Sequence, residues 1–142
     1  MRSIPVVSGG IVAGTLIVVG EAILNLLLLG DEWNALLLRF ELSQPTTAIV
    51  LQGLLKLMIL GVVSVWLAVG MRPALVRPER AGLVAGLVVW FLVWAWVQWG
   101  MLLVGYVTST IAAVTVAWGV VELPLAVHAG IWMHDRFDSR AS

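Results

Sequence analysis

Long uninterrupted apolar runs constrain this chain more than any other feature of its sequence. Three apolar windows each exceed the roughly 20 residues that a helix needs to cross a bilayer core, and the last window is long enough for two helices. Hydrophobic residues make up 61% of the sequence and charged residues 11%. Soluble domains carry about a quarter charged residues, so the composition predicts a polytopic membrane protein.

Four membrane-spanning helices are expected, arranged as an all-α antiparallel bundle in a single membrane domain over residues 1–142. The predicted spans are residues 8–29, 47–70, 79–104 and 109–133. Gly105 suits a helix end, and Thr108 can cap the fourth helix. The first span is expected to be retained, because the sequence LLLLGDEW lacks the small-x-small pattern of a signal-peptide cleavage site.

The first loop contains a short amphipathic segment, residues 31–42. Trp33, Leu36, Leu37 and Phe40 would share one face of a helix there, which predicts a helix lying in the membrane interface with Trp33 as an anchor. We expect this helix to be a structural lid, and the alternative is a gate over an external vestibule.

Basic residues outside the predicted spans are distributed unequally between the two sides. The first loop contains only Arg39, and the opposite side contains Arg2, Arg72, Arg77, Arg80, Arg136 and Arg140. Cytoplasmic segments carry an excess of Lys and Arg. This pattern predicts a multi-pass protein of a bacterial cytoplasmic (inner) membrane with both termini in the cytoplasm.

An acidic and a basic residue lie at the same depth in the first two spans. Glu21 and Lys56 would each lie roughly 12–14 Å below the outer surface at 1.5 Å per residue. A charge in hydrocarbon costs several kcal/mol unless it is paired. The sequence therefore predicts an intramembrane Glu21–Lys56 ion pair.

Every span contributes polar groups to one layer near this depth. The layer contains two carboxyls and one ammonium, so if Lys56 pairs with Glu21, no cation is left for Glu122. Pro124 frees the carbonyl of Val120 beside it, so Glu122 could be a proton or cation site. The alternative is a neutral carboxyl that hydrogen-bonds a neighbouring helix. The predicted polar cluster is Glu21, Asn25, Gln52, Lys56, Gln98, Thr115 and Glu122.

Small residues at helical spacing predict where helices pack closely. Candidates are Gly10 and Gly14 in the first span, Gly82 and Gly86 in the third, and Gly119 in the fourth. Gly82 and Gly86 point about 160° away from Gln98. If Gln98 faces the polar layer, their face is free for an oligomer or another subunit, and the alternative is contact with the Gly10–Gly14 face of the parallel first helix.

The third span is rich in tryptophan, with the sequence WFLVWAWVQWG. Trp90 and Trp94 are expected to pack in the core, and the alternative is a flat surface, completed by His128, for a ring-bearing lipid, quinone or pigment. One chain cannot supply paired haem ligands at a common depth. No cofactor and no metal site is predicted.

The sequence offers little material for catalysis, because it has no cysteine, two histidines and no nucleophile–base motif. We expect no enzymatic activity, no catalytic residues and no nucleic-acid binding. The favoured function is an accessory or assembly subunit, or a homo-oligomeric scaffold, in contact with the lipid bilayer. The first alternative is a small proton- or cation-linked transporter or channel centred on Glu122, and the second is the ring-ligand binder.

Overall fold

The computed structural model of the chain describes residues 3–140, with the side chains of residues 4–139. These residues form helices and connections only, and four helices are long and apolar enough to cross a membrane by length and composition. The elements are α1 (Ser3–Ala22), η1 (Ile23–Leu28), α2 (Gly30–Arg39), α3 (Thr47–Met71), η2 (Arg72–Ala74), η3 (Pro78–Arg80), α4 (Ala81–Trp90), η4 (Phe91–Ala95), α5 (Trp96–Leu103) and α6 (Ser109–Arg140).

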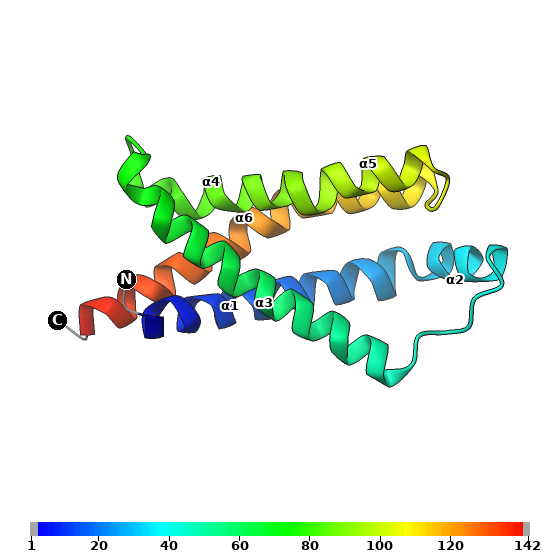
Figure 1. Ribbon diagram of the computed structural model, residues 1–142, viewed down its shortest axis with the longest axis horizontal. Coiled ribbons are helices and arrows are strands. Elements are labelled where there is room, and N and C mark those ends of the chain that lie inside the picture. Colours follow the sequence, from blue (N-terminus) through cyan, green and yellow to red (C-terminus); the bar gives the residue numbers. More distant parts are fainter. Residues whose placement is uncertain (1–2, 141–142) are drawn as a thin grey trace.

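The long helices alternate in direction along the chain (Figure 1). Both described ends of the chain and the α3–α4 connection lie at one end of the bundle, here called the termini end. Helix α2 and the α5–α6 turn lie at the other, here called the α2 end. At the termini end, Nη2 of Arg72 donates to Oδ2 of Asp135 at 2.7 Å, which links η2, directly after α3, to α6. Arg2 and the side chain of Arg140 are two of the six basic residues on which the predicted orientation depends, and they lie outside the described residues.

The predicted helices are present, with shifted boundaries. Helix α1 begins five residues before the predicted start at residue 8. Helix α6 continues past residue 133 to Arg140 and contains Pro124 in its middle. Figure 1 shows α6 changing direction in this region, as expected where a proline removes one hydrogen bond of the helix. The predicted segment 31–42 is helical over Gly30–Arg39.

Local signals set several helix ends. Oγ1 of Thr46 accepts from the backbone N–H of Ile49 at the start of α3, and Oγ1 of Thr108 accepts from Ile111 at the start of α6. Gly105, with a φ of 76°, ends α5. The N–H of Tyr106 bonds to the carbonyl of Met101, and the N–H of Gly105 bonds to that of Leu102, so the end is a Schellman motif.

Glycines bring α1 into backbone contact with two other helices. Gly14 lies against Met58 and Gly61 on α3. Gly9 lies against Gly130, which joins α1 to α6. In each case a Cβ at the glycine would overlap the backbone of the opposing helix, so the small residue sets the helix separation. Gly10 takes part in the same α1–α3 contact, against Val62.

The expectation that Gly82 and Gly86 present a free face is wrong. Gly82 lies against His128 and Gly86 against Pro124, so both contact α6 of the same chain. The third and fourth helices are neighbours joined by a short turn, and their closest approach uses this glycine face. The face is therefore not available to a partner.

The bundle is tightly packed at the termini end and opens toward the α2 end. The two larger core clusters contain residues such as Ala13, Val65, Val127, Ile17 and Leu123, all buried. By contrast, residues 47–52 at the start of α3 are all exposed, and Figure 1 shows these turns diverging from the other helices.

Candidate functional site

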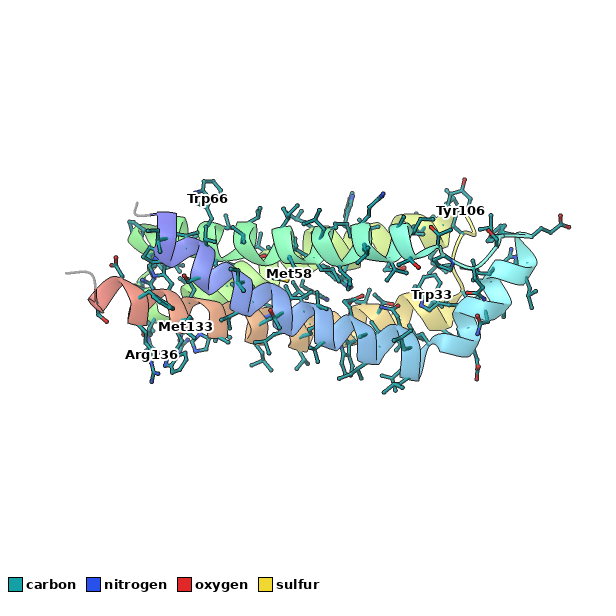
Figure 2. The ribbon with its side chains drawn as sticks, turned by 90° about the horizontal axis from the view of Figure 1, so that it is seen from below. Trp33, Met58, Trp66, Tyr106, Met133 and Arg136 are labelled. Atoms are coloured by element: carbon teal, nitrogen blue, oxygen red, sulfur yellow. The ribbon has the colours of Figure 1, made fainter. Side chains whose placement is uncertain are left out.

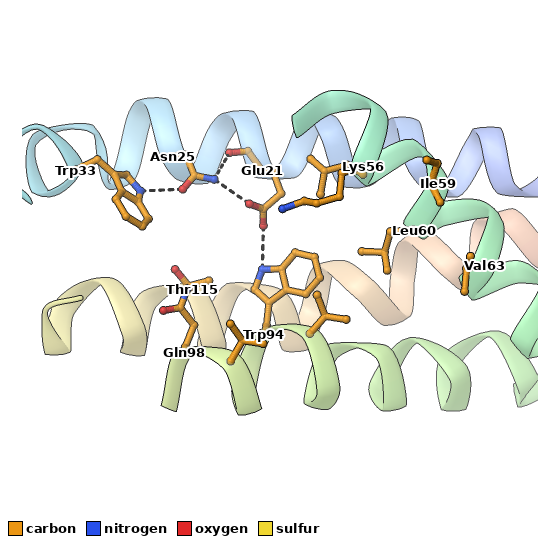
Figure 3. Close-up of a pocket in the computed structure, with 13 residues that line it drawn as sticks. Glu21, Asn25, Trp33, Lys56, Ile59, Leu60, Val63, Trp94, Gln98 and Thr115 are labelled. Atoms are coloured by element: carbon orange, nitrogen blue, oxygen red, sulfur yellow. Dashed lines mark hydrogen bonds between the residues drawn. The ribbon is translucent and has the colours of Figure 1, made fainter. Parts of the chain in front are cut away.

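A cavity of about 450 Å³ lies where the helices diverge (Figure 3). Helices α1, α3 and α6 contribute to its wall, together with the two π-helical turns η1 and η4, α5 and Trp33 of α2. Its lining residues are Glu21, Asn25, Trp33, Lys56, Leu57, Ile59, Leu60, Val63, Val93, Trp94, Val97, Gln98 and Thr115.

Glu21 is held by side chains from two different helices. Nδ2 of Asn25 donates to its Oε2 at 2.8 Å, and the indole Nε1 of Trp94 donates to its Oε1 at 3.1 Å. Nε1 of Trp33 in turn donates to Oδ1 of Asn25 at 2.8 Å. Figure 3 shows this chain of hydrogen bonds along one side of the cavity. Each carboxylate oxygen of Glu21 therefore has a donor fixed by the fold.

The two π-helical turns contain two side chains of this hydrogen-bond network and determine their direction. Asn25 lies in η1 and Trp94 lies in η4. A π turn contains one extra residue, which rotates the following side chains by about 100° relative to a continuous α-helix. The predicted helices were uninterrupted, so the roles of Trp33 and Trp94 were missed. The only sequence signal was the four-residue spacing of Glu21 and Asn25, which places them on one face.

Lys56 faces Glu21 across the cavity without touching it. Figure 3 shows its side chain directed toward Glu21, and the two charges attract one another electrostatically. The direct ion pairs within 4.0 Å among the described residues are Arg72–Asp135 and His134–Asp135. Glu21 and Lys56 therefore line the same cavity as opposite charges, but they do not form the predicted direct ion pair. The carboxylate of Glu21 is already held by hydrogen bonds from Asn25 and Trp94.

Other members of the predicted polar cluster are divided between the cavity and its surroundings. Gln98 and Thr115 line the cavity, and both Oε1 of Gln98 and Oγ1 of Thr115 are buried without a hydrogen-bond partner. Thr115 is 4% exposed. Gln52 lies one turn beyond Lys56 on the diverging part of α3, outside the cavity and exposed.

Glu122 lies outside the cavity, behind its wall. Both of its carboxyl oxygens are buried, and no group among the described residues lies in full hydrogen-bond geometry with them, although the side chain of Trp118 interacts with the carboxyl. Its carboxyl group packs on Gly20 of α1, the neighbour of Glu21. One turn earlier on α6, the indole Nε1 of Trp118 is also buried without a partner.

The cavity has an apolar side opening. Ile59 and Val63 of α3 and Val93 and Val97 of the third helix line the cavity and are also 39–55% exposed on the outer surface of the bundle. Among the polar lining residues, Thr115 of α6 is buried, Glu21 and Asn25 are half-buried, and Lys56 of α3 is exposed. The cavity thus combines an apolar mouth with a polar lining that carries one negative and one positive charge.

The structure does not bring Trp90, Trp94 and His128 into one surface. Nε1 of Trp90 donates to the carbonyl of Val116 at 2.9 Å, and both tryptophan rings pack on Gly119. Trp94 lines the cavity, whereas the exposed His128 lies on α6 with its backbone against Gly82. The two indoles are therefore engaged in helix packing.

No cluster of three or more His, Asp or Glu side chains suited to a metal ion occurs within residues 3–140.

Comparison with models of known protein families, with curated proteins and with solved structures gave no significant match.

Proposed function

We propose that this chain is a multi-pass protein of a bacterial cytoplasmic membrane that binds a phospholipid headgroup in its cavity and performs no chemical reaction. Its outer surface supports a bilayer location, because large apolar side chains along the helices point outward. Leu26 is 75% exposed and Trp66 57% exposed, and Figure 2 shows Trp66 directed away from α3. The arginines 72, 77, 80 and 136 lie at the termini end and support a cytoplasmic position for that end.

The observation that carries the binding proposal is the polar lining behind an apolar side opening. Ile59, Val63, Val93 and Val97 would meet lipid at the mouth. Behind the mouth, Oε1 of Gln98 is buried without a donor among the described residues. Lys56 lines the cavity from its exposed side, and no acceptor within residues 4–139 lies in hydrogen-bonding contact with it. Polar groups in hydrocarbon are costly until they are paired, so an amphiphile that enters through the mouth would satisfy both.

The charges of the cavity favour a zwitterionic headgroup. Glu21 and Lys56 sum to zero, so a ligand with a net charge would leave an uncompensated charge inside the bundle. A phosphate would pair with Lys56. An ammonium with N–H donors would lie near Glu21, Gln98 and Thr115. Phosphatidylethanolamine carries both groups, whereas phosphatidylcholine has no N–H donor and phosphatidylglycerol has a net negative charge.

Native mass spectrometry tests this proposal with the protein in nanodiscs that contain equal amounts of these three lipids. We expect phosphatidylethanolamine to be retained preferentially. Lys56→Met should reduce its retention about tenfold or more, since a charge-assisted hydrogen bond contributes about 1.5–3 kcal/mol.

Gln52→Leu provides the matched control, because Gln52 is a polar residue on the same helix but outside the cavity. It should leave lipid retention unchanged. Equal retention of all three lipids by the wild type and by Lys56→Met would rule out a headgroup site.

A second candidate function is the accessory or scaffold subunit expected from the sequence, within a homo-oligomer or larger complex. The observation that favours it is the diverging start of α3, where Gln52 is exposed beside exposed leucines such as Leu51 and Leu55. A polar side chain facing lipid is unfavourable, so a second protein could cover this surface.

Because the sequence contains no cysteine, a disulfide crosslink can form only through a cysteine that is introduced by substitution. Gln52→Cys should give disulfide-linked dimers in oxidised membranes if copies of the chain meet at α3. Val121→Cys, at an exposed position on α6, is the control. Equal crosslinking of the two variants, or none, would count against an interface on α3.

A further inference from the structure

Glu122 is a buried carboxyl that the proposed lipid site does not use. Among the described residues neither of its oxygens has a partner that meets hydrogen-bond geometry, and both oxygens are shielded from solvent. A carboxylate in this position would be desolvated, with the indole N–H of Trp118 as its one neighbouring donor within the described residues, which is unfavourable by several kcal/mol in general. A neutral carboxyl avoids most of that penalty.

Within residues 4–139, the groups around Glu122 offer it no cation. From α1 it meets Gly20 and the negative charge of Glu21. From α3 the cation Lys56 is directed toward Glu21, as Figure 3 shows. The facing parts of α4 and η4 contain no titratable residue. On α6 itself the nearest polar group is the indole N–H of Trp118, one turn away.

The carboxyl of Glu122 packs on Gly20, the neighbour of Glu21, and the two carboxyls interact electrostatically. Such a pair favours a state in which only one of the two carboxyls is negatively charged. Glu21 has donors on both oxygens, from Asn25 and Trp94, and a cation facing it. Within the described residues Glu122 has no facing cation and no complete hydrogen bond, and its neighbouring donor is the indole N–H of Trp118. The geometry therefore distinguishes the carboxyl that carries the charge from the one that carries the proton.

We infer that Glu122 is a proton-binding site, in which a neutral carboxyl behind the cavity wall is coupled to the charge on Glu21. Loss of the charge on Glu21 removes the repulsion, and Glu122 then releases its proton more readily. The indole N–H of Trp118 can donate to the carboxylate that forms. This inference concerns a group outside the cavity and holds whether or not a lipid binds.

Infrared difference spectroscopy on the protein in nanodiscs tests the inference. The wild-type spectrum minus that of Glu122→Gln should show the C=O stretching band of a protonated carboxyl at neutral pH. In Glu21→Gln the same band should be lost at a lower pH than in the wild type. Absence of the band at neutral pH, or identical titrations in the presence and absence of the Glu21 charge, would overturn the inference.

A hydrophobic carbodiimide gives a second measurement on the unmodified chain, in case Glu122→Gln does not fold. The carboxyl proton moves to a carbodiimide nitrogen and the carboxyl oxygen adds to the central carbon. The acyl group then shifts to nitrogen as a stable N-acylurea, which adds the full reagent mass. An adduct on the Glu122 peptide supports the inference, and an adduct only on the Glu21 peptide, or none, contradicts it.

Discussion

The Cα of Gly20 lies against the carboxyl group of Glu122, and a Cβ at position 20 would overlap that carboxyl. Gly20 belongs to α1 and Glu122 to α6, so this contact joins the first and last helices of the bundle. It also places a carboxyl directly behind Glu21, the next residue in α1. The size of residue 20 therefore controls both helix packing and the environment of Glu122.

Gly20→Ala should destabilise the protein, because its methyl group requires space that the Glu122 carboxyl occupies. Overpacking typically costs about 1–3 kcal/mol, and we expect the lower end of that range because the opposing atoms are the end of the flexible Glu122 side chain. The free energy of unfolding, measured by SDS titration in mixed micelles, should fall by that amount. Shortening the opposing side chain with Glu122→Ala should recover part of the loss in the double variant.

Gly53→Ala is the control for this substitution. A Cβ at Gly53 would meet no heavy atom within 4 Å. Because alanine is favoured over glycine within helices by roughly 0.5–1 kcal/mol, this variant should be as stable as the wild type or slightly more stable. Equal losses for the two glycine substitutions would show that the contact with Glu122 is not the cause.

Trp94→Phe should destabilise the protein by about 1–3 kcal/mol, because it removes the donor to Oε1 of Glu21 while keeping an aromatic ring. The same unfolding measurement applies. Trp96→Phe is the control, since Trp96 is 58% exposed and lies outside the cavity. If both substitutions had the same effect, the hydrogen bond to Glu21 would contribute nothing specific.

The helices and the polar layer could be predicted from the sequence because they depend on local patterns. Apolar length fixes the four long helices, and the four-residue spacing fixes Asn25 beside Glu21. Depth along two antiparallel helices also placed Lys56 level with Glu21, and the structure brings both into one cavity.

The remaining features depend on how helices pack, which the sequence pattern did not reveal. The π turns that carry Asn25 and Trp94 interrupt segments that look uniformly helical. The divergence of α3 leaves Gln52 outside the layer in which its depth placed it. A continuous α-helix over the third span, with Gln98 facing inward, would direct Gly82 and Gly86 away from the bundle, which predicts a free glycine face. In the structure both glycines contact α6.

The proposed orientation of the chain in the membrane predicts different accessibility of its two ends. Val76, fully exposed in the α3–α4 connection, and Ser43, exposed between α2 and α3, lie at opposite ends of the bundle. With single cysteines at these positions, a membrane-impermeant maleimide applied to intact cells should label Ser43→Cys and spare Val76→Cys. Labelling should reach Val76→Cys once the membrane is opened, and the reverse pattern would invert the proposed topology.

The opposite charges of Glu21 and Lys56 should show energetic coupling despite the absence of direct contact. Lys56→Met alone leaves Glu21 charged without a facing cation, so it should destabilise more than the double variant of Glu21→Gln with Lys56→Met. Coupling between neighbouring charged groups is typically about 0.5–3 kcal/mol. We expect a value in the lower half of that range, because Lys56 is exposed and the carboxylate is already held by Asn25 and Trp94. Additive losses in the unfolding titrations would show that Lys56 does not stabilise Glu21.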